Sequence, residues 1–304
     1  MIEWFRRNPV IICVMFMFLS TGATLHNKFI FDHVLKSSNC LLLVQNAVTL
    51  IVLLIMRRAG VVVFHSSVNT DWLAGFFYAA NVVCGLWSLT YVNVVMFGVL
   101  KRCTILVTWS IEFLFSSNHN TVACLPSLLV MMVGTLTAGH YDTTFSMLGY
   151  SLAAASCFTQ GIAFELSQRA AKRSHGVCSV LYSNSVASLI LLAVILFVNG
   201  ELRELISRPI TTGLILHLIL NSCTCLALNF FVFLNCYVNS PLAHTVTGNM
   251  KIVLTSTLGV ILFATPLSGI GFVGLCLNFL GGGWFSWIKM KASKTVRSAK
   301  HSIV

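Results

Sequence analysis

Charged residues are scarce in this sequence, and acidic residues are the scarcest of them. Only 9% of the 304 residues are charged, with eight Asp and Glu against nineteen Lys and Arg, whereas a soluble domain carries about 25% charged residues. Hydrophobic residues make up 57% of the chain, and the mean hydropathy is +0.88. Too few polar residues remain to cover a soluble surface, so the composition indicates a polytopic membrane protein.

Motifs that would point to metal or membrane-enzyme chemistry are also missing. The eleven cysteines are scattered, mostly in apolar runs, with no C-x-x-C pair and no Cys/His cluster of metal-ligand spacing. Asp32, Asp71 and Asp142 fall in predicted loops and form no D-x-D pair, which argues against a membrane-embedded glycosyltransferase. We therefore expect no metal, no cofactor and no enzymatic activity.

What the sequence does contain is a series of apolar stretches. Each is close to the ~20 residues that a helix needs to cross a bilayer, whereas barrel strands would be ~10-residue alternating segments. The first stretch could be a signal peptide, but it is longer than a typical h-region, so we interpret it as a retained span. The sequence therefore predicts an all-α membrane protein with ten transmembrane helices. They cover residues 9–31, 41–56, 72–90, 94–115, 122–139, 148–166, 177–198, 211–234, 240–263 and 269–288.

Basic residues fall mainly on one side of this arrangement. If the N-terminus is cytosolic, twelve of the nineteen Lys and Arg lie in cytosolic segments, four lie on the opposite side and three lie within spans. Cytosolic loops of membrane proteins carry such an excess. We therefore expect both termini to be cytosolic, with residues 289–304 forming a basic cytosolic tail. This placement explains most of the net charge of +11 without a nucleic-acid partner.

The cations within spans suggest an internal repeat. Lys101 lies in the fourth predicted span and Lys251 in the ninth. An offset of five spans inverts the second copy in the membrane, and inverted repeats with a site at the bilayer midplane are typical of secondary transporters. We predict a single transporter domain over residues 1–304, built from two inverted five-helix repeats at about 9–140 and 148–288.

Lys251 is the only charge in its span. An ammonium at the bilayer centre costs roughly 2.5–3.5 kcal/mol on insertion scales, so it needs a polar cavity, a partner or an anionic ligand. Gly248 and Thr255 share its helix face, where the glycine permits close approach and the threonine offers a hydroxyl. One interpretation is a phosphate-binding lysine. The alternative is a structural lysine paired with a buried carboxylate, for which Glu112 is the candidate.

The fourth span carries the other two cations. Lys101 and Arg102 are adjacent and point about 100° apart around a helix. Arg102 suits a bidentate grip on phosphate or carboxylate, while Lys101 acts as a point charge. Glu112 follows roughly 16 Å further along the helix, too far for a direct pair with Lys101. We expect Glu112 near the cytosolic end, as a gate or a counter-ion, and the three cations together at a central site that holds phosphate.

Two polar residues in the seventh span could recognise a base. The ring of Tyr182 can stack on a base, and the amide of Asn184 can read its edge. The alternative is an interfacial tyrosine and a hydrogen bond between helices, which are common in membrane proteins. These two interpretations stay open at the level of the sequence.

These stretches resemble the nucleotide-sugar transporters of the drug/metabolite transporter superfamily over essentially the whole chain. The resemblance is carried by VLKRCTILVTWSIE in the fourth span, LYSN in the seventh and SPLAHTVTGNMK in the ninth. At the positions of the family's GDP-mannose motifs, FYNN and GALNK, the chain has Leu181-Tyr182-Ser183-Asn184 and Gly248-Asn249-Met250-Lys251. Because these motifs are only half present, the resemblance favours UDP-sugars over GDP-sugars.

The resemblance implies an antiporter in the Golgi or ER membrane, with a homodimer as one assembly open to it. A cytosolic nucleotide-diphosphate sugar would enter the lumen, and the nucleoside monophosphate would leave. The alternative within the same fold is a sugar-phosphate or triose-phosphate exchanger, which needs the cations but no base pocket. A proton-coupled drug exporter would instead need membrane carboxylates. The expected substrate-binding residues are Lys251, Lys101, Arg102, Gly248, Asn249, Thr255, Tyr182 and Asn184.

Overall fold

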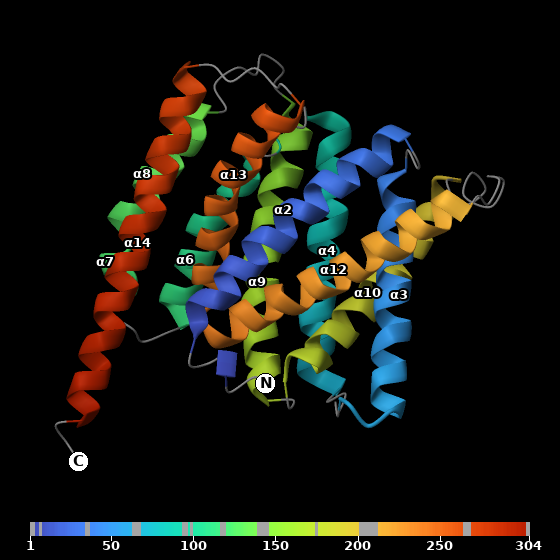
Figure 1. Ribbon diagram of the computed structural model, residues 1–304, viewed down its shortest axis with the longest axis horizontal. Helices are drawn as coiled ribbons and strands as arrows, with labels where there is room; N and C mark the ends of the chain where they lie inside the picture. The colour runs from blue at the N-terminus through green and yellow to red at the C-terminus, as the bar shows by residue number, and fades with distance from the viewer. Residues whose placement is uncertain are drawn as a thin grey trace. The chain divides into compact units, whose positions relative to one another are not determined.

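The computed structural model describes residues 4–5, 8–33, 37–62, 68–92, 97, 100–115, 120–138, 146–173, 176–200, 212–263 and 269–301. Within these ranges the chain is helical and contains no strand (Figure 1). The helices are α2 (Pro9–His33), α3 (Ser38–Arg58), α4 (Val68–Tyr91), α6 (Thr104–Phe115), α7 (Asn120–Ala123), α8 (Leu125–Ala138), α9 (Met147–Arg173), α10 (Val177–Val198), α12 (Thr212–Val238), α13 (Pro241–Phe263) and α14 (Gly269–His301).

The all-α prediction is confirmed for the described residues. Among them, five helical segments are long and apolar enough to cross a membrane, and two further apolar helices are shorter. The long segments are Pro9–Asn27, Asn39–Arg58, Val177–Val198, Thr212–Val238 and Gly269–Lys291, and the shorter ones are Trp72–Ser88 and Leu125–Thr137. The number of ten spans and their inverted repeat remain predictions.

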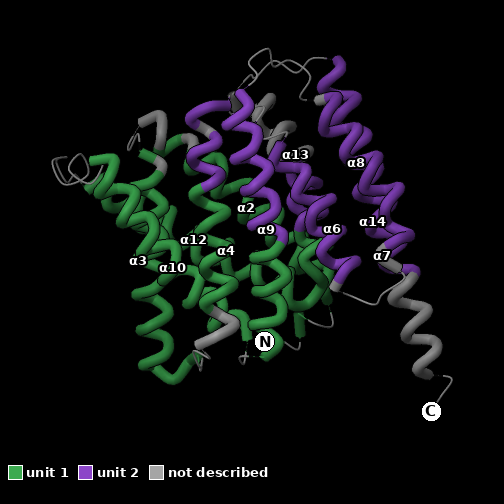
Figure 2. Tube along the Cα trace, turned by 180° about the vertical axis from the view of Figure 1, so that it is seen from behind, with its two compact units in different colours: residues 1–83, 162–244 green, residues 84–161, 245–304 purple. Residues whose placement is uncertain are grey.

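The chain divides into two compact units, which Figure 2 colours separately. Unit 1 contains residues 1–83 and 162–244, and unit 2 contains residues 84–161 and 245–304. Each unit therefore combines segments from both halves of the sequence. The three points of division fall within α4, α9 and α13.

Unit 1 has an apolar core to which α2, α3, α9, α10 and α12 all contribute. Its buried members are Ile12, Leu53, Ala170, Ala171, Val177, Val180, Leu181, Phe233 and Leu234. α4 joins this unit through Gly75, where a Cβ atom would lie 3.0 Å from the carbonyl oxygen of Ser183 and 3.2 Å from the Cβ atom of Ala187. A residue without a side chain thus lets the α4 backbone approach α10 closely.

In unit 2, α8 and α14 pack through glycines. A Cβ atom at Gly134 would lie 2.6 Å from the carbonyl oxygen of Gly274, and one at Gly281 would lie 2.9 Å from the carbonyl oxygen of Ser127. The Asn278 side chain donates a hydrogen bond from α14 to Thr135 Oγ1 on α8 at 2.9 Å. Small residues and hydrogen bonds from the Asn278 amide, which also donates to the carbonyl oxygen of Met131 at 3.4 Å, therefore join these helices, as is usual within membranes.

Several predicted spans differ from the structure; the sixth, predicted over 148–166, continues to Arg173 in α9. The fifth, predicted over 122–139, consists of α7 and α8 with a turn at Cys124 between them. Pro126 explains the break, because it has no amide hydrogen to donate to the carbonyl oxygen of Val122 one turn earlier.

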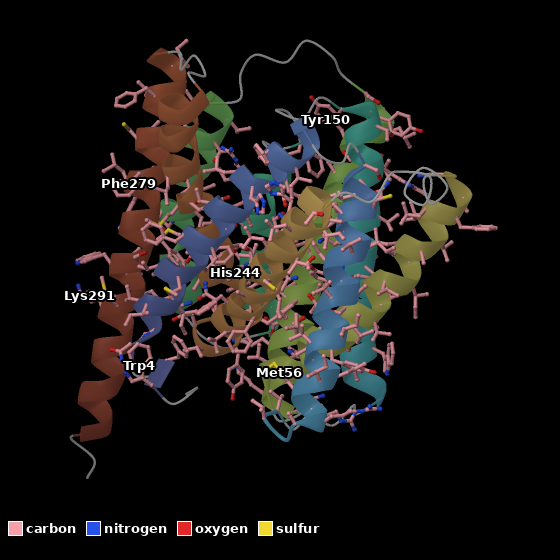
Figure 3. All side chains as sticks on the ribbon, turned by 45° about the vertical axis from the view of Figure 1, so that its right-hand side comes forward. Trp4, Met56, Tyr150, His244, Phe279 and Lys291 are labelled. Carbon is pink, nitrogen blue, oxygen red and sulfur yellow. The ribbon has the colours of Figure 1, made fainter. Side chains whose placement is uncertain are left out.

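The tenth span, predicted to end at residue 288, continues without interruption to the end of α14. Neither Gly nor Pro occurs between residues 289 and 301 to stop the helix. Lys289 lies 5.7 Å from the ring of Phe285 and Lys291 lies 5.3 Å from that of Trp287, each one turn away. Figure 3 labels Lys291 and Phe279, which are both exposed on this helix. Most of the predicted basic tail is thus a helical extension of the span.

Candidate functional site

The fourth predicted span is interrupted where its two cations lie. Residues 100–102 are helical, Cys103 forms a turn and α6 begins at Thr104, whereas the sequence predicted one unbroken span over 94–115. The amide of Cys103 donates to the carbonyl oxygen of Leu100 at 3.0 Å, which is the tighter bond of a 3₁₀ turn. Part of the predicted span before this point lies outside the described residues.

Side chains donate hydrogen bonds to the carbonyl groups beside the break. Thr104 Oγ1 donates to the carbonyl oxygen of Lys101 at 2.6 Å, and Cys157 Sγ on α9 donates to the carbonyl oxygen of Leu100 at 3.3 Å. Such bonds replace helical bonds that a break would leave unmade. The interruption is therefore supported by α9, and neither Gly nor Pro marks it in the sequence.

Lys101 has a specific partner that the sequence analysis missed. Its ammonium donates a hydrogen bond to Ser156 Oγ on α9, and the Ser156 side chain is fully buried. A Cβ atom at Gly85 on α4 would lie 3.4 Å from this oxygen, so the space beside the pair is narrow. Gln160 lies one turn after Ser156 and has its Oε1 atom 3.5 Å from Thr104 Oγ1. One polar row of α9 thus faces the segment that carries Lys101.

Arg102 has a different environment. It is half-buried and makes no hydrogen bond, ion pair or ring contact with the residues that the structure describes. A guanidinium group presents five N–H donors in a planar fork that matches carboxylate or phosphate oxygens. Arg102 is thus the cation of this site that is most available to an anionic ligand. Glu112 is half-buried on α6 and has an interaction partner, and its role as a gate remains a prediction.

The ninth predicted span is the continuous helix α13. Gly248, Lys251 and Thr255 therefore share one helix face, as their spacing predicted. Lys251 is half-buried, whereas Asn249 is only 8% exposed. A Cβ atom at Gly248 would meet none of the described atoms within 4 Å, so this glycine leaves room beside Lys251. The side chain of Thr255 lies outside the described residues.

Met250 fixes the position of α13 within unit 2. A Cβ atom at Gly282 of α14 would lie 2.6 Å from Met250 Cγ, so the methionine side chain packs directly on the α14 backbone. Because Met250 precedes Lys251, this contact restrains the part of α13 that carries the ammonium group.

Tyr182 and Asn184 both lie on α10 in unit 1. Tyr182 is half-buried and packs against the apolar core of that unit. Asn184 is 2% exposed, and neither its Nδ2 nor its Oδ1 atom makes a hydrogen bond with the described part of the chain. Buried amides are normally paired, so Asn184 keeps both a donor and an acceptor for another group. The hydrogen bond between helices that we considered for Asn184 is not seen among the described residues.

The structure assigns the predicted residues to two groups. Unit 2 holds the three cations with Gly248 and Asn249, and unit 1 holds Tyr182 and Asn184. Whether these groups meet at one site remains a prediction. Ser156 and Gln160 were missed because uncharged polar residues carry little insertion cost, and only their i, i+4 spacing on α9 could have indicated them.

Comparison with known proteins identifies the family. No family model matches the chain. The chain is 32% identical over 228 residues to UDP-galactose/UDP-glucose transporter 7 of Arabidopsis thaliana, and the match covers 72% of this chain and 69% of that protein. The chain belongs to the nucleotide-sugar transporters. Membership in this family agrees with the resemblance inferred from the sequence and with the expectation of a protein that is not an enzyme.

Two further comparisons bear on this nucleotide-sugar transporter. GDP-mannose transporter GONST2 of Arabidopsis thaliana is 22% identical to it over 301 residues, covering 94% of this chain and 80% of that protein. A crystal structure with 14% sequence identity superposes with a TM-score of 0.70, covering 93% of this chain and 97% of its own. The similarity to this crystal structure concerns the fold alone.

Proposed function

We propose that this transporter is an antiporter that exchanges a cytosolic nucleotide-diphosphate sugar for the corresponding nucleoside monophosphate. The observation that carries the proposal is the half-buried Arg102, a cation without a described partner in an apolar span, together with Lys101 and Lys251 in the same unit. Three cations offset the negative charge of a diphosphate. Without an anion Arg102 would have no charge partner among the described residues, so an empty carrier would switch sides slowly and couple the two fluxes.

Base recognition is assigned in this proposal to α10. The buried amide of Asn184, which has no hydrogen-bond partner among the described residues, supplies a donor and an acceptor, and Tyr182 supplies a ring. These residues can therefore read and stack on a base. We favour a UDP-sugar, because the GDP-mannose motifs are only half present. The relative named for UDP-sugars is also more similar in sequence than the one named for GDP-mannose.

The proposal includes the arrangement in the membrane. Ten spans form two inverted five-helix repeats, both termini face the cytosol, and Glu112 acts as a gate near the cytosolic end. The compartment is the Golgi, or the ER, and the nucleotide sugar enters its lumen. A homodimer is compatible with this scheme, and chemical crosslinking of the purified protein would test it.

Exchange in proteoliposomes tests the function. Vesicles that contain the purified protein are preloaded with UMP, GMP, inorganic phosphate or buffer, and uptake of labelled nucleotide sugars and sugar phosphates is measured. The proposal expects UDP-sugar uptake that depends on internal UMP. Uptake of sugar phosphates against internal phosphate, without nucleotide-sugar uptake, would instead establish the sugar-phosphate exchanger. Arg102→Ala should abolish uptake, whereas Lys172→Ala, an exposed cation at the end of α9, should not.

A further inference from the structure

A chain of hydrogen bonds within unit 1 connects α2, α3 and α12. The Gln45 side chain on α3 donates to Asn221 Oδ1 on α12. Asn221 Nδ2 lies 2.7 Å from Asn27 Oδ1 and 3.5 Å from His26 Nδ1, both on α2. His26 Nε2 lies in turn 3.5 Å from His217 Nδ1 on α12. Asn221 is fully buried and Gln45 is 4% exposed, whereas Asn27 and the two histidines are half-buried.

The amide of Asn221 fixes the direction of every bond in this chain. Its oxygen accepts from Gln45, so its nitrogen faces α2 and its two hydrogens are directed to Asn27 and His26. His26 Nδ1 must therefore be an acceptor, which places the hydrogen of the neutral ring on Nε2. That hydrogen points to His217 Nδ1, which must also be an acceptor. The chain is fully paired only while both histidines are neutral.

One added proton would leave two donors facing each other. A hydrogen on His26 Nδ1 would oppose the Asn221 amide nitrogen, and a hydrogen on His217 Nδ1 would oppose the N–H group of His26. Turning the Asn221 amide relieves the first conflict only if the Gln45 and Asn27 amides turn with it, because its nitrogen would otherwise face the donor of Gln45. Protonation therefore either breaks a link or requires a concerted turn of all three amides.

We propose that His26 and His217 form a binding site for a single proton, and that its occupation releases α2 from α12 and α3 at this end of unit 1. Among the described side chains, His217 is the titratable group that faces His26. Asn27, Asn221 and Gln45 are neutral, and the ring of Phe29, 5.2 Å from that of His217, is apolar. Free histidine titrates near pH 6.5.

The thermal stability of the purified full-length protein tests this proposal without any transport assay. The Tm is measured between pH 7.5 and 5.5 in an uncharged detergent. Unfolded histidines take up protons as the pH falls below about 6.5, whereas the folded pair must break a bond to do so, so the wild-type Tm should fall by a few degrees. A wild-type Tm that does not change over this range would overturn the proposal.

A double variant isolates the pair. His26→Gln with His217→Asn keeps a neutral donor at the position of His26 Nε2 and an acceptor at that of His217 Nδ1, but it cannot titrate and it lacks the acceptor that His26 Nδ1 offers to Asn221. Its Tm at pH 7.5 should therefore be somewhat lower than that of the wild type, and it should fall less than the wild-type Tm between pH 7.5 and 5.5. His244, a buried histidine elsewhere in unit 1, is retained in both proteins, so any titration of that ring cancels in the comparison. A double variant with the wild-type pH dependence would refute the assignment.

A second variant, for which the Tm is expected to change with pH in the opposite direction, tests the proposal if the double variant does not fold. Asn221→Asp places a carboxylate beside His26, and this carboxylate accepts a hydrogen bond from the protonated His26 ring. Asn27 can turn its side-chain nitrogen toward the other carboxylate oxygen. The Tm of this variant should rise as the pH falls from 7.5 to 5.5. A fall like that of the wild type would show that His26 is not the proton-binding group.

Discussion

Lys251 is the residue whose replacement best separates a binding role from a structural one. Lys251→Ala should abolish exchange while insertion persists, because removing a mid-span ammonium relieves roughly 2–3 kcal/mol of insertion cost. Lys251→Arg should retain little activity, since a planar guanidinium fork does not replace the compact point charge of an ammonium group. Uptake of labelled UDP-sugar, normalised to the amount of inserted protein, measures both effects.

The structural alternative predicts the reverse for the same variant. If Lys251 mainly neutralises Glu112, then Lys251→Ala should misfold, and adding Glu112→Gln should restore the folded protein. Transport near the wild-type level by a well-expressed Lys251→Ala carrier would rule out the phosphate site. Lys172→Ala is the matched control, because it removes an exposed lysine outside the site.

Ser156 is the second residue for which the structure makes a definite prediction. Loss of its hydroxyl removes an acceptor from the Lys101 ammonium, and hydrogen bonds to charged groups contribute about 1.5–3 kcal/mol. Because Lys101 is only half-buried and water can replace part of the bond, we expect Ser156→Ala to raise the KM for the nucleotide sugar about 3- to 10-fold. Initial uptake rates at varied substrate concentration give the value.

A serine on the same helix provides the control for this change. Ser151 is exposed and its hydroxyl donates only to the carbonyl oxygen of Leu148 one turn earlier, so Ser151→Ala should leave the KM unchanged. Equal values for Ser156→Ala and the wild type would mean that the bond to Lys101 does not influence substrate binding.

Of the residues at the site, the charged ones could be predicted most directly from the sequence. Lys101, Arg102 and Lys251 are recognisable because a cation within an apolar span is costly and needs a reason. Ser156 is not recognisable in this way, since serines are common in membrane helices and its partner is 55 positions away in the chain. Asn184 also lacks a hydrogen-bond partner in the part of the chain that the structure describes, which is a property of packing and could not be predicted from the sequence.

At the scale of elements, the contact between α8 and α14 predicts opposite results for two neighbouring glycines. Gly281→Ala would place a Cβ atom 2.9 Å from backbone atoms of Ser127 and Met131, and such overpacking typically costs about 1–3 kcal/mol. Gly283→Ala would meet none of the described atoms within 4 Å, and alanine favours a helix over glycine by about 1 kcal/mol. The Tm should therefore fall for the first variant and hold or rise for the second. An equal loss in both would contradict close packing at Gly281.

The helices themselves were largely predictable because long apolar runs define them, but their interruptions were only partly so. The turn at Cys124 precedes Pro126, whose chemistry disfavours an unbroken helix. No proline follows the turn at Cys103 to indicate it in the sequence. It depends on Thr104 and Cys157, whose side chains take up the carbonyl groups of Lys101 and Leu100, and the second of these bonds comes from a distant part of the chain.

For the whole molecule, orientation in the membrane is the first prediction to check. Twelve of the nineteen Lys and Arg lie in the proposed cytosolic segments, so tags at both termini should face the cytosol. Antibodies should reach both tags after selective permeabilisation of the plasma membrane. Labelling of either tag only after complete detergent lysis would exclude the proposed arrangement of ten spans.

The choice of base is the second prediction at this scale. UMP should compete with labelled nucleotide sugar for uptake and GMP should not, because only half of the GDP-mannose motifs is present around Asn184 and Lys251. Competition is measured in the same vesicles, with the two monophosphates at equal concentration. Strong competition by GMP alone would reverse the assignment to UDP-sugars.

The length of α14 also provides a way to detect conformational changes of the transporter. Its 33 residues correspond to roughly 50 Å at 1.5 Å per residue, against a hydrocarbon thickness of about 30 Å. The helix therefore leaves the bilayer without a joint, and a helical carrier protein fused in register after His301 would inherit its direction. Because the fused protein would extend far from the membrane, a small tilt of α14 would move its far end by a large distance. Single-particle images could then be sorted by the conformational state of the transporter.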